Sequence, residues 1–349
     1  MNKKNRRHNS RAFLWLLFLG VLVVVFFILD LLLGSVMIPV SKVFSAIFGS
    51  PGASDTTVTI INEFRFPKAL TAILTGAALS VSGLQMQTVF RNPLAGPYVL
   101  GISAGASLGV ALFVMGFSSF VAIGIFSAAG AWPLAIIAWL GAFIVMLLVL
   151  YVSSKVNDIM TILILGILFT AATGAIVSIL QYFSNESMLK AFIIWTMGSL
   201  GSVTKSQLTV LTPAVMLGIL LAFLKLKDLN AFLLGENYAR SLGINIIRSR
   251  LIIFLSTSLL AGTITAFCGP IGFIGIAVPH IARVIFRTAN HSVLLPAVIL
   301  LGSILMLFSD IVSQLPGMQT TLPINSVTAL IGIPVIVWMI VKNKRFSSV

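Results

Sequence analysis

The sequence predicts an all-α, polytopic integral membrane protein with about ten transmembrane helices and both termini in the cytoplasm. Of its 349 residues, 58% are hydrophobic and 9% are charged, whereas soluble domains carry roughly 25% charged residues. The mean hydropathy is +1.11, and the apolar residues form too many long runs for one buried core. Because the membrane interior offers the backbone no water, these runs are expected to be helices.

Polar residues or Gly and Pro separate the apolar runs from one another. A helix needs about 20 residues to cross a hydrocarbon core of about 30 Å. The expected spans are 12–34, 66–90, 97–116, 131–152, 158–183, 207–224, 250–268, 271–287, 293–312 and 325–341. They make up a single transmembrane domain, 1–349, to which no soluble domain is attached.

The basic residues set the orientation of these spans. The first span follows the stretch KKNRRHNSR and lacks a small-residue cleavage site, so it is expected to be an uncleaved span whose basic flank stays in the cytoplasm. With both termini inside, only five of the 22 lysines and arginines fall in outer segments, namely Lys42, Arg65, Lys68, Lys190 and Lys205. The positive-inside rule predicts this asymmetry.

Two outer segments are less regular than the spans. Residues 92–154 contain no charged residue, but Arg91 and Lys155 both favour the cytoplasm, so two crossings are expected between them. This leaves 117–130 as an outer, partly re-entrant segment. The segment 188–206 is short and rich in Gly and Ser, and we expect a short outer helix there, packed over the mouth of the bundle.

The longest polar insert on the inner side is 226–250. Its apolar residues recur as in short amphipathic helices, which Gly235 and Gly243 interrupt. The apolar positions are Leu229, Phe232, Leu233, Tyr238 and Leu242. Such a helix pair is typical either of a surface that grips a partner or of a surface helix among lipid headgroups.

Several function classes are disfavoured. Cys268 is the only cysteine and lies in an apolar run, so neither an internal disulfide nor a cysteine metal cluster is expected. His280 has no second His or Cys at metal-ligand spacing, and no metal site is predicted. The net charge of +14 follows from topology, so no nucleic-acid partner is expected. No G-x-x-x-x-G-K-[ST] motif occurs, so ATP energy has to come from another subunit.

Asp30 and Asp310 are scarce acidic residues in apolar runs, and both fall near outer helix ends. Transporters coupled to protons or sodium hold ionisable groups near mid-membrane. Pairing or snorkelling is therefore the favoured interpretation of these two residues, and ion coupling within this chain is disfavoured.

One motif suggests an enzyme. Gly101-Ile-Ser103-Ala-Gly105 matches the G-x-S-x-G nucleophile elbow, and Asp158 and His280 follow in the order of a hydrolase triad. The elbow requires a preceding strand, whereas these surroundings are apolar helical runs. The glycines recur every four residues, which is the small-xxx-small pattern of closely packed membrane helices, so no catalytic residue is predicted.

The stretch Phe64–Lys68 is expected to begin the second span, with Pro67 in the first helical turn, where proline is tolerated. Arg65 and Lys68 are three residues apart, so both cations fall on one side of the helix. These two cations either anchor the helix end at the membrane–water interface or form a docking site for acidic residues of an outer partner.

Five stretches, in chain order, together resemble one family, the membrane subunits of ABC importers for iron-siderophores, haem and cobalamin. The stretches are RFPKALTAILTGAALSVSGLQMQTVFRNPLAGPYVLGISAGASLG, WTMGSLGSV, LNAFLLGENYARSLGI, GPIGFIGIAVPHIARVIF and LPINSVTALIGIPVIVWMI. The resemblance implies a permease of the bacterial cytoplasmic (inner) membrane that performs no covalent chemistry. It implies a pair of such subunits, a homodimer or heterodimer, two cytoplasmic ATPase subunits that use ATP and Mg, and an extracytoplasmic substrate-binding protein.

The resemblance also assigns roles to residues. The segment 229–244 looks like the cytoplasmic coupling segment, with Leu234, Gly235, Tyr238, Ala239, Leu242 and Gly243 contacting the ATPase. Arg65 and Lys68 look like docking points for the binding protein. The translocation path and its inner gate would include Gln87, Asn92, Pro93 and Leu94, with the path lined mainly by the second and fifth helices.

The sequence departs from the family pattern at the final span, where Thr321 and Asn325 stand in place of an acidic residue and a glycine and no arginine precedes them. At position 68 the family commonly has an arginine. Lys68 keeps the positive charge but cannot form the two parallel hydrogen bonds that a guanidinium makes to a carboxylate. The cargo, siderophore, haem or cobalamin, is left open. The alternative function is an ATP-independent secondary carrier or channel.

Overall fold

The computed structural model describes residues 3–34, 36–49, 54–116, 132–156, 158–314 and 321–342, with side chains described from residue 11 onwards except at 340 and 342. Within these ranges all regular elements are helices, which confirms the all-α prediction. The expected re-entrant segment 117–130 lies outside the described residues.

Ten helices correspond to the ten expected spans. They are α1 (Lys3–Leu32), α4 (Phe66–Val89), α5 (Ile102–Ala111), α7 (Trp132–Lys155), α8 (Ile159–Phe183), α10 (Lys205–Leu224), α13 (Ile246–Cys268), α14 (Ile274–Phe286), α15 (His291–Ser313) and α16 (Ile324–Lys342). In the described part of the chain, seven helices are long and apolar enough to cross a membrane, and three shorter apolar helices, Ile102–Gly116, Ile274–Phe286 and Ile324–Met339, accompany them.

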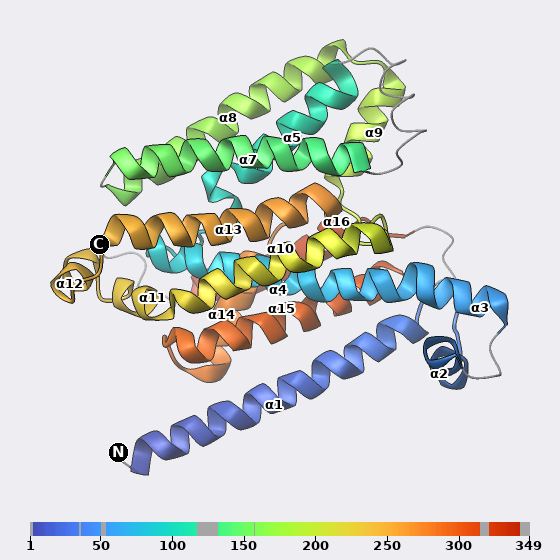
Figure 1. Cartoon of the computed structure of the whole chain (residues 1–349), viewed down its shortest axis with the longest axis horizontal. Coiled ribbons are helices and arrows are strands. Elements are labelled where there is room, and N and C mark those ends of the chain that lie inside the picture. Colours follow the sequence, from blue (N-terminus) through green and yellow to red (C-terminus); the bar gives the residue numbers. More distant parts are fainter. Residues whose placement is uncertain are drawn as a thin grey trace.

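The short helices lie at the two ends of the bundle (Figure 1). α11 (Leu226–Phe232) and α12 (Glu236–Ser241) lie at the end where α1 begins, which we call the inner end. α2 (Val40–Phe48), α3 (Asp55–Thr59) and α9 (Glu186–Thr196) lie at the opposite, outer end. The expected outer helix within 188–206 thus corresponds to α9 and the turn that follows it.

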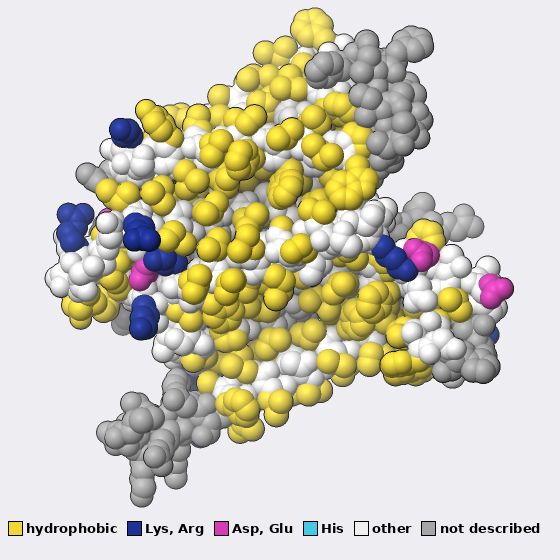
Figure 2. Space-filling view, in the orientation of Figure 1, with side chains coloured by type: hydrophobic (Ala, Val, Ile, Leu, Met, Phe, Trp, Pro, Cys, Tyr) yellow, Lys and Arg dark blue, Asp and Glu magenta, His cyan; other side chains and the backbone are white. Residues whose placement is uncertain are grey.

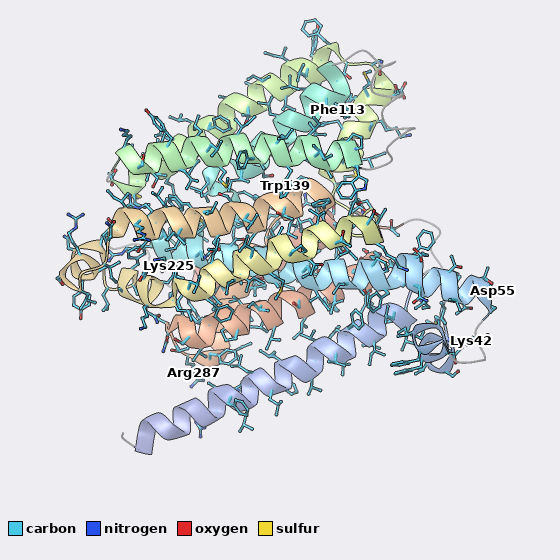
Figure 3. The ribbon with its side chains drawn as sticks, viewed as in Figure 1. Lys42, Asp55, Phe113, Trp139, Lys225 and Arg287 are labelled. Atoms are coloured by element: carbon cyan, nitrogen blue, oxygen red, sulfur yellow. The ribbon has the colours of Figure 1, made fainter. Side chains whose placement is uncertain are left out.

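Charge follows the same division. Hydrophobic side chains cover the middle of the molecule, and most Lys and Arg side chains on the face shown gather at the inner end (Figure 2). Lys225 and Arg287 lie at this end, whereas Lys42 and Asp55 lie at the outer end (Figure 3). The apolar band between the two charged ends has the distribution expected of a chain that crosses a bilayer.

Helix α4 forms the axis of the bundle. In its most apolar stretch of 18 residues, 89% of the residues are buried. α10, α13, α14 and α15 all pack against it. Gly76 faces the backbone of Gly302 in α15, and Gly83 faces the backbone of Gly275 in α14, so closely that a Cβ at either position would overlap a carbonyl oxygen. Small residues permit such backbone contact between membrane helices.

The second span extends further outward than predicted. α4 begins at Phe66, as expected, but the helical run reaches outward to Asp55 through a π-helical segment, η1, over Ile60–Arg65. Ser54 caps the first turn of this run by accepting a hydrogen bond from the N–H of Thr57. Pro67 is the second residue after the π segment, where the altered hydrogen-bond register tolerates a residue without an N–H.

We expect Gly83→Ala to destabilise the fold by about 1–3 kcal/mol, because the added methyl group would overpack the contact with Gly275. Gly174→Ala on α8 is the matched control, since nothing lies within 4 Å of a Cβ there. Unfolding in mixed micelles measures both variants. Equal stability of the two would contradict the close packing of α4.

Candidate functional site

Arg65 lies at the outer end and joins the start of α4 to the end of α1. Its guanidinium donates hydrogen bonds to the carbonyl oxygens of Leu31 at 2.8 Å and Leu32 at 3.1 Å, and to that of Val36. The last carbonyls of a helix have no partner within the helix. Arg65 supplies that partner for α1, so its donors are directed into the protein.

Lys68 lies one turn further along α4 and forms an ion pair with Asp310 of α15, with 3.0 Å between Nζ and Oδ1. The side chain of Asp310 is 2% exposed and that of Lys68 is 17% exposed. The carboxyl group of Asp30 from α1 lies against that of Asp310. Lys68, Asp310 and Asp30 therefore form an acid–base cluster, here called the outer cluster, that connects α1, α4 and α15.

The outer cluster forms part of the wall of a cavity of about 510 Å³. Arg65, Lys68 and Asp310 line it, together with residues from α9, the turn after α9 and the start of α16. The structure thus brings the two predicted docking cations together at the outer end, but binds both internally. Asp310 was not assigned to this site from sequence, although an acidic residue within an apolar run signals such a pair.

The predicted coupling segment forms two short helices at the inner end, and both predicted breaks are present. Gly235 and Gly243 have φ angles of +111° and +80°, values that favour glycine. Leu234, Tyr238 and Leu242 are 65%, 48% and 58% exposed. Tyr238 lies within α12, whereas Leu234 precedes the break at Gly235 and Leu242 follows the last residue of α12, and together they form an exposed apolar surface of the segment.

The opposite face of the segment is fixed to the bundle. Ala239 is fully buried, and Glu236 accepts a hydrogen bond of 2.6 Å from Arg250, a buried residue of α13. In α11, Asp228 pairs with Lys225 at 2.8 Å and accepts a hydrogen bond from Ser249 at 2.6 Å. The apolar face is therefore presented by a well-anchored segment.

The predicted gate residues follow the end of α4. Asn92 and Leu94 are exposed, and the Asn92 side chain accepts a hydrogen bond from the N–H of Leu94 at 2.9 Å, which closes an Asx turn. Arg91 precedes them with φ +50°, and its Nε donates to the carbonyl of Phe232 in α11 at 3.4 Å. This turn therefore lies next to the coupling segment.

Gln87, predicted to line the path, is buried at the inner part of α4. Its amide donates to the carbonyl of Ile276 at 3.1 Å and accepts from Arg283 at 2.5 Å. In this conformation the amide of Gln87 forms hydrogen bonds that connect α4 to α14. Its role in the path stays a prediction.

The residues of the hydrolase-like motif serve helix structure. Ser103 lies within α5, and no strand precedes it in the described residues. Asp158 caps α8, and hydrogen bonds from Thr161 hold the pKa of its carboxyl below the usual value. The ring of His280 makes an edge contact with Trp338, 6.2 Å between centroids. This supports the prediction that the motif carries no catalysis.

Comparison with known proteins decides the family. Residues 22–342 match the model of the FecCD transport family. The chain belongs to the FecCD transport family. It is 35% identical to the hemin transport system permease protein HmuU of Yersinia pestis over 288 residues, which cover 82% of this chain and 84% of HmuU. It is 33% identical to the vitamin B12 import system permease protein BtuC of Salmonella paratyphi A over 345 residues, 98% of each chain.

A solved structure has the same fold. It is described as a metal-chelate type ABC transporter in an inward-facing conformation, and it matches with a TM-score of 0.80 and 30% identity over 94% of this chain and 98% of its own. This FecCD chain is therefore a multi-pass membrane permease of a bacterial ABC importer. A separate ATPase subunit uses the ATP, and ATPase and binding-protein partners follow from the family.

We expect Asp310→Asn to lower the free energy of unfolding by about 3 kcal/mol. This is the lower end of the range for breaking a buried ion pair, because the carboxyl group of Asp30 remains beside Lys68. The double variant Lys68→Met/Asp310→Asn should recover much of this loss, since no cation is left without its partner. Unfolding in mixed micelles measures both.

Glu63→Gln is the control for this pair, because it breaks an ion pair with Lys205 whose side chains are about half exposed. Such exposed pairs contribute less than about 1 kcal/mol. Equal losses for Asp310→Asn and Glu63→Gln would contradict the structural role of the outer cluster.

Proposed function

We propose that this permease carries a large metal chelate, haem or cobalamin, into the cytoplasm as one of two identical subunits. The named functions of HmuU and BtuC support this cargo class. The buried axis α4 supports the pairing, because it fills the centre of the single chain and leaves no room there for a chelate. The path then lies between two copies, next to the exposed apolar face of α8, the fifth predicted span.

Each subunit contacts one ATPase subunit through its coupling segment. The exposed face of Leu234, Tyr238 and Leu242 supports this assignment, because apolar and aromatic side chains outside the membrane are typical anchors of a protein interface. Gly235 and Gly243 set the turns of the segment, and Ala239 allows it to pack closely on the bundle.

The substrate-binding protein docks at the outer end over the cavity lined by Arg65 and Lys68. The supporting observation is that both cations reach this cavity, where acidic side chains of a partner would be attracted. The turn Asn92–Leu94 closes the path on the inner side, as its exposed position at the inner end suggests.

Uptake by proteoliposomes tests the proposed function. Vesicles containing the permease, its ATPase and its binding protein are given radiolabelled haemin or cyanocobalamin. We expect one of the two to accumulate, and only with ATP inside and the binding protein outside. Equal accumulation by the permease alone would indicate an ATP-independent carrier or channel instead.

We expect Leu242→Glu to weaken ATPase binding by about 30-fold, equivalent to about 2 kcal/mol, because a charge would enter the apolar centre of the interface. Phe48→Glu is the control, since Phe48 is also exposed, 73% against 58% for Leu242, but lies on α2 at the outer end. Affinity is measured by titrating the purified ATPase subunit onto permease in nanodiscs. Unchanged binding by Leu242→Glu would contradict the assigned face.

A further inference from the structure

His291 occupies the point where three helices meet at the inner end. It is the first residue of α15 and is fully buried. α15 packs along α4, and α11 of the coupling segment packs against both α4 and α15. A polar ring in this position has to find hydrogen-bond partners within the protein.

The ring bonds on one side to α11 and on the other to α4. Nδ1 lies 2.9 Å from Oδ1 of Asn230 in α11, and the backbone N–H of His291 donates to the same oxygen at 2.8 Å. Nε2 lies 2.8 Å from Oγ1 of Thr88 in the last turn of α4. His291 is therefore a direct polar link between the coupling segment and the axial helix.

The chemistry of these contacts fixes the direction of each hydrogen bond. The backbone N–H can only donate, so Oδ1 of Asn230 is the acceptor and Nδ1 of the ring has to donate to it. In the neutral ring Nε2 then accepts, and its donor is the hydroxyl of Thr88. Substituting Thr88 removes one identifiable bond of the triad, whereas substituting the side chain of His291 removes both ring bonds and substituting Asn230 removes both bonds to His291.

Thr88 has a second acceptor, which makes this link reversible. Its Oγ1 lies 2.8 Å from the carbonyl oxygen of Leu84 in its own helix. The hydroxyl has one proton, so it donates either to His291 or to Leu84. α4 can therefore release the coupling segment without leaving the hydroxyl of Thr88 unpaired.

The link acts close to the predicted gate. Gln87, the residue before Thr88, joins α4 to α14, and the turn with Asn92 and Leu94 begins a few residues later. A displacement of α11 that pulls on Thr88 would therefore reach the end of α4 that carries this turn.

We propose that His291 is a positioning residue that transmits movement of the coupling segment to α4, through Asn230 on one side and Thr88 on the other. This inference rests on the proposed coupling role of α11 and α12. It assigns the transmission to one hydrogen-bonded triad, Asn230–His291–Thr88, rather than to general packing of the helices.

The test measures movement of the turn rather than stability. Leu94→Cys places a thiol on the turn, and Cys268, the only natural cysteine, is buried. The complete importer with its ATPase is reconstituted, and the rate of maleimide labelling is compared between the ADP-bound and the vanadate-trapped states. We expect the two rates to differ at least about fivefold, the lower end for coupled sites.

Three variants in this background test the bond between the residue at position 291 and Thr88. Thr88→Val removes only the hydroxyl, and His291→Asn keeps an amide near the Nδ1 position but does not reach Thr88. Both should abolish the nucleotide-dependent difference. His291→Gln reaches Thr88 and retains the backbone bond to Asn230, so it should preserve the difference.

Thr71→Val is the matched control, because Thr71 is a buried α4 residue whose hydroxyl donates to Pro67 of its own helix at 2.7 Å. It should preserve the difference at a similar thermal stability. Retention of the difference in Thr88→Val would overturn the inference while the coupling function stands. If the parent Leu94→Cys importer shows no difference between the nucleotide states, the proposed coupling itself fails, and the inference with it.

Discussion

The enclosure of α4 is the constraint on which the rest of the structure depends. Its glycines bring its backbone against the backbones of α14 and α15, and its side chains are buried along nearly its whole length. A helix held in this way cannot move far on its own. Polar side chains near its two ends attach other elements to it, and both proposed functional regions lie at these ends.

The two ends use polar chemistry differently. At the outer end, Lys68 and Asp310 form an ion pair between α4 and α15, and Arg65 satisfies the carbonyls that end α1. At the inner end, Thr88 makes a neutral hydrogen bond to α15, and Gln87 bonds to α14 by donating to Ile276 and accepting from Arg283. Breaking a buried ion pair is far more costly than exchanging one neutral hydrogen bond for another. The outer end is accordingly the firmer attachment, and the inner end is the one suited to change.

Much of the fold could be predicted from sequence, because the membrane restricts the backbone to helices and the basic residues report orientation. The breaks at Gly235 and Gly243 were predicted, and both glycines have positive φ angles. The outward extension of the second span to Asp55 was not predicted, because the π segment at Ile60–Arg65 has no simple periodic signal. Proline at position 67 suggested the start of the span, although the helical run continues beyond it.

The candidate sites were only partly accessible to sequence reasoning. The spacing of apolar residues, Tyr238 and Leu242 among them, indicated short amphipathic helices, whereas Leu234 was assigned only from the family resemblance. Spacing could not show that Lys68 meets Asp310, or that His291 meets Thr88, because these pairs are separated by more than 200 residues of chain and meet only through the packing of α4 on α15.

The proposed ATPase contact requires that the end formed by α11 and α12 faces the cytosol. A cysteine at the exposed position Asn237 of α12 tests this most directly in intact cells, with a membrane-impermeant thiol reagent added from outside. We expect no labelling until the cells are permeabilised. Labelling of intact cells would invert the topology and contradict the assigned ATPase contact.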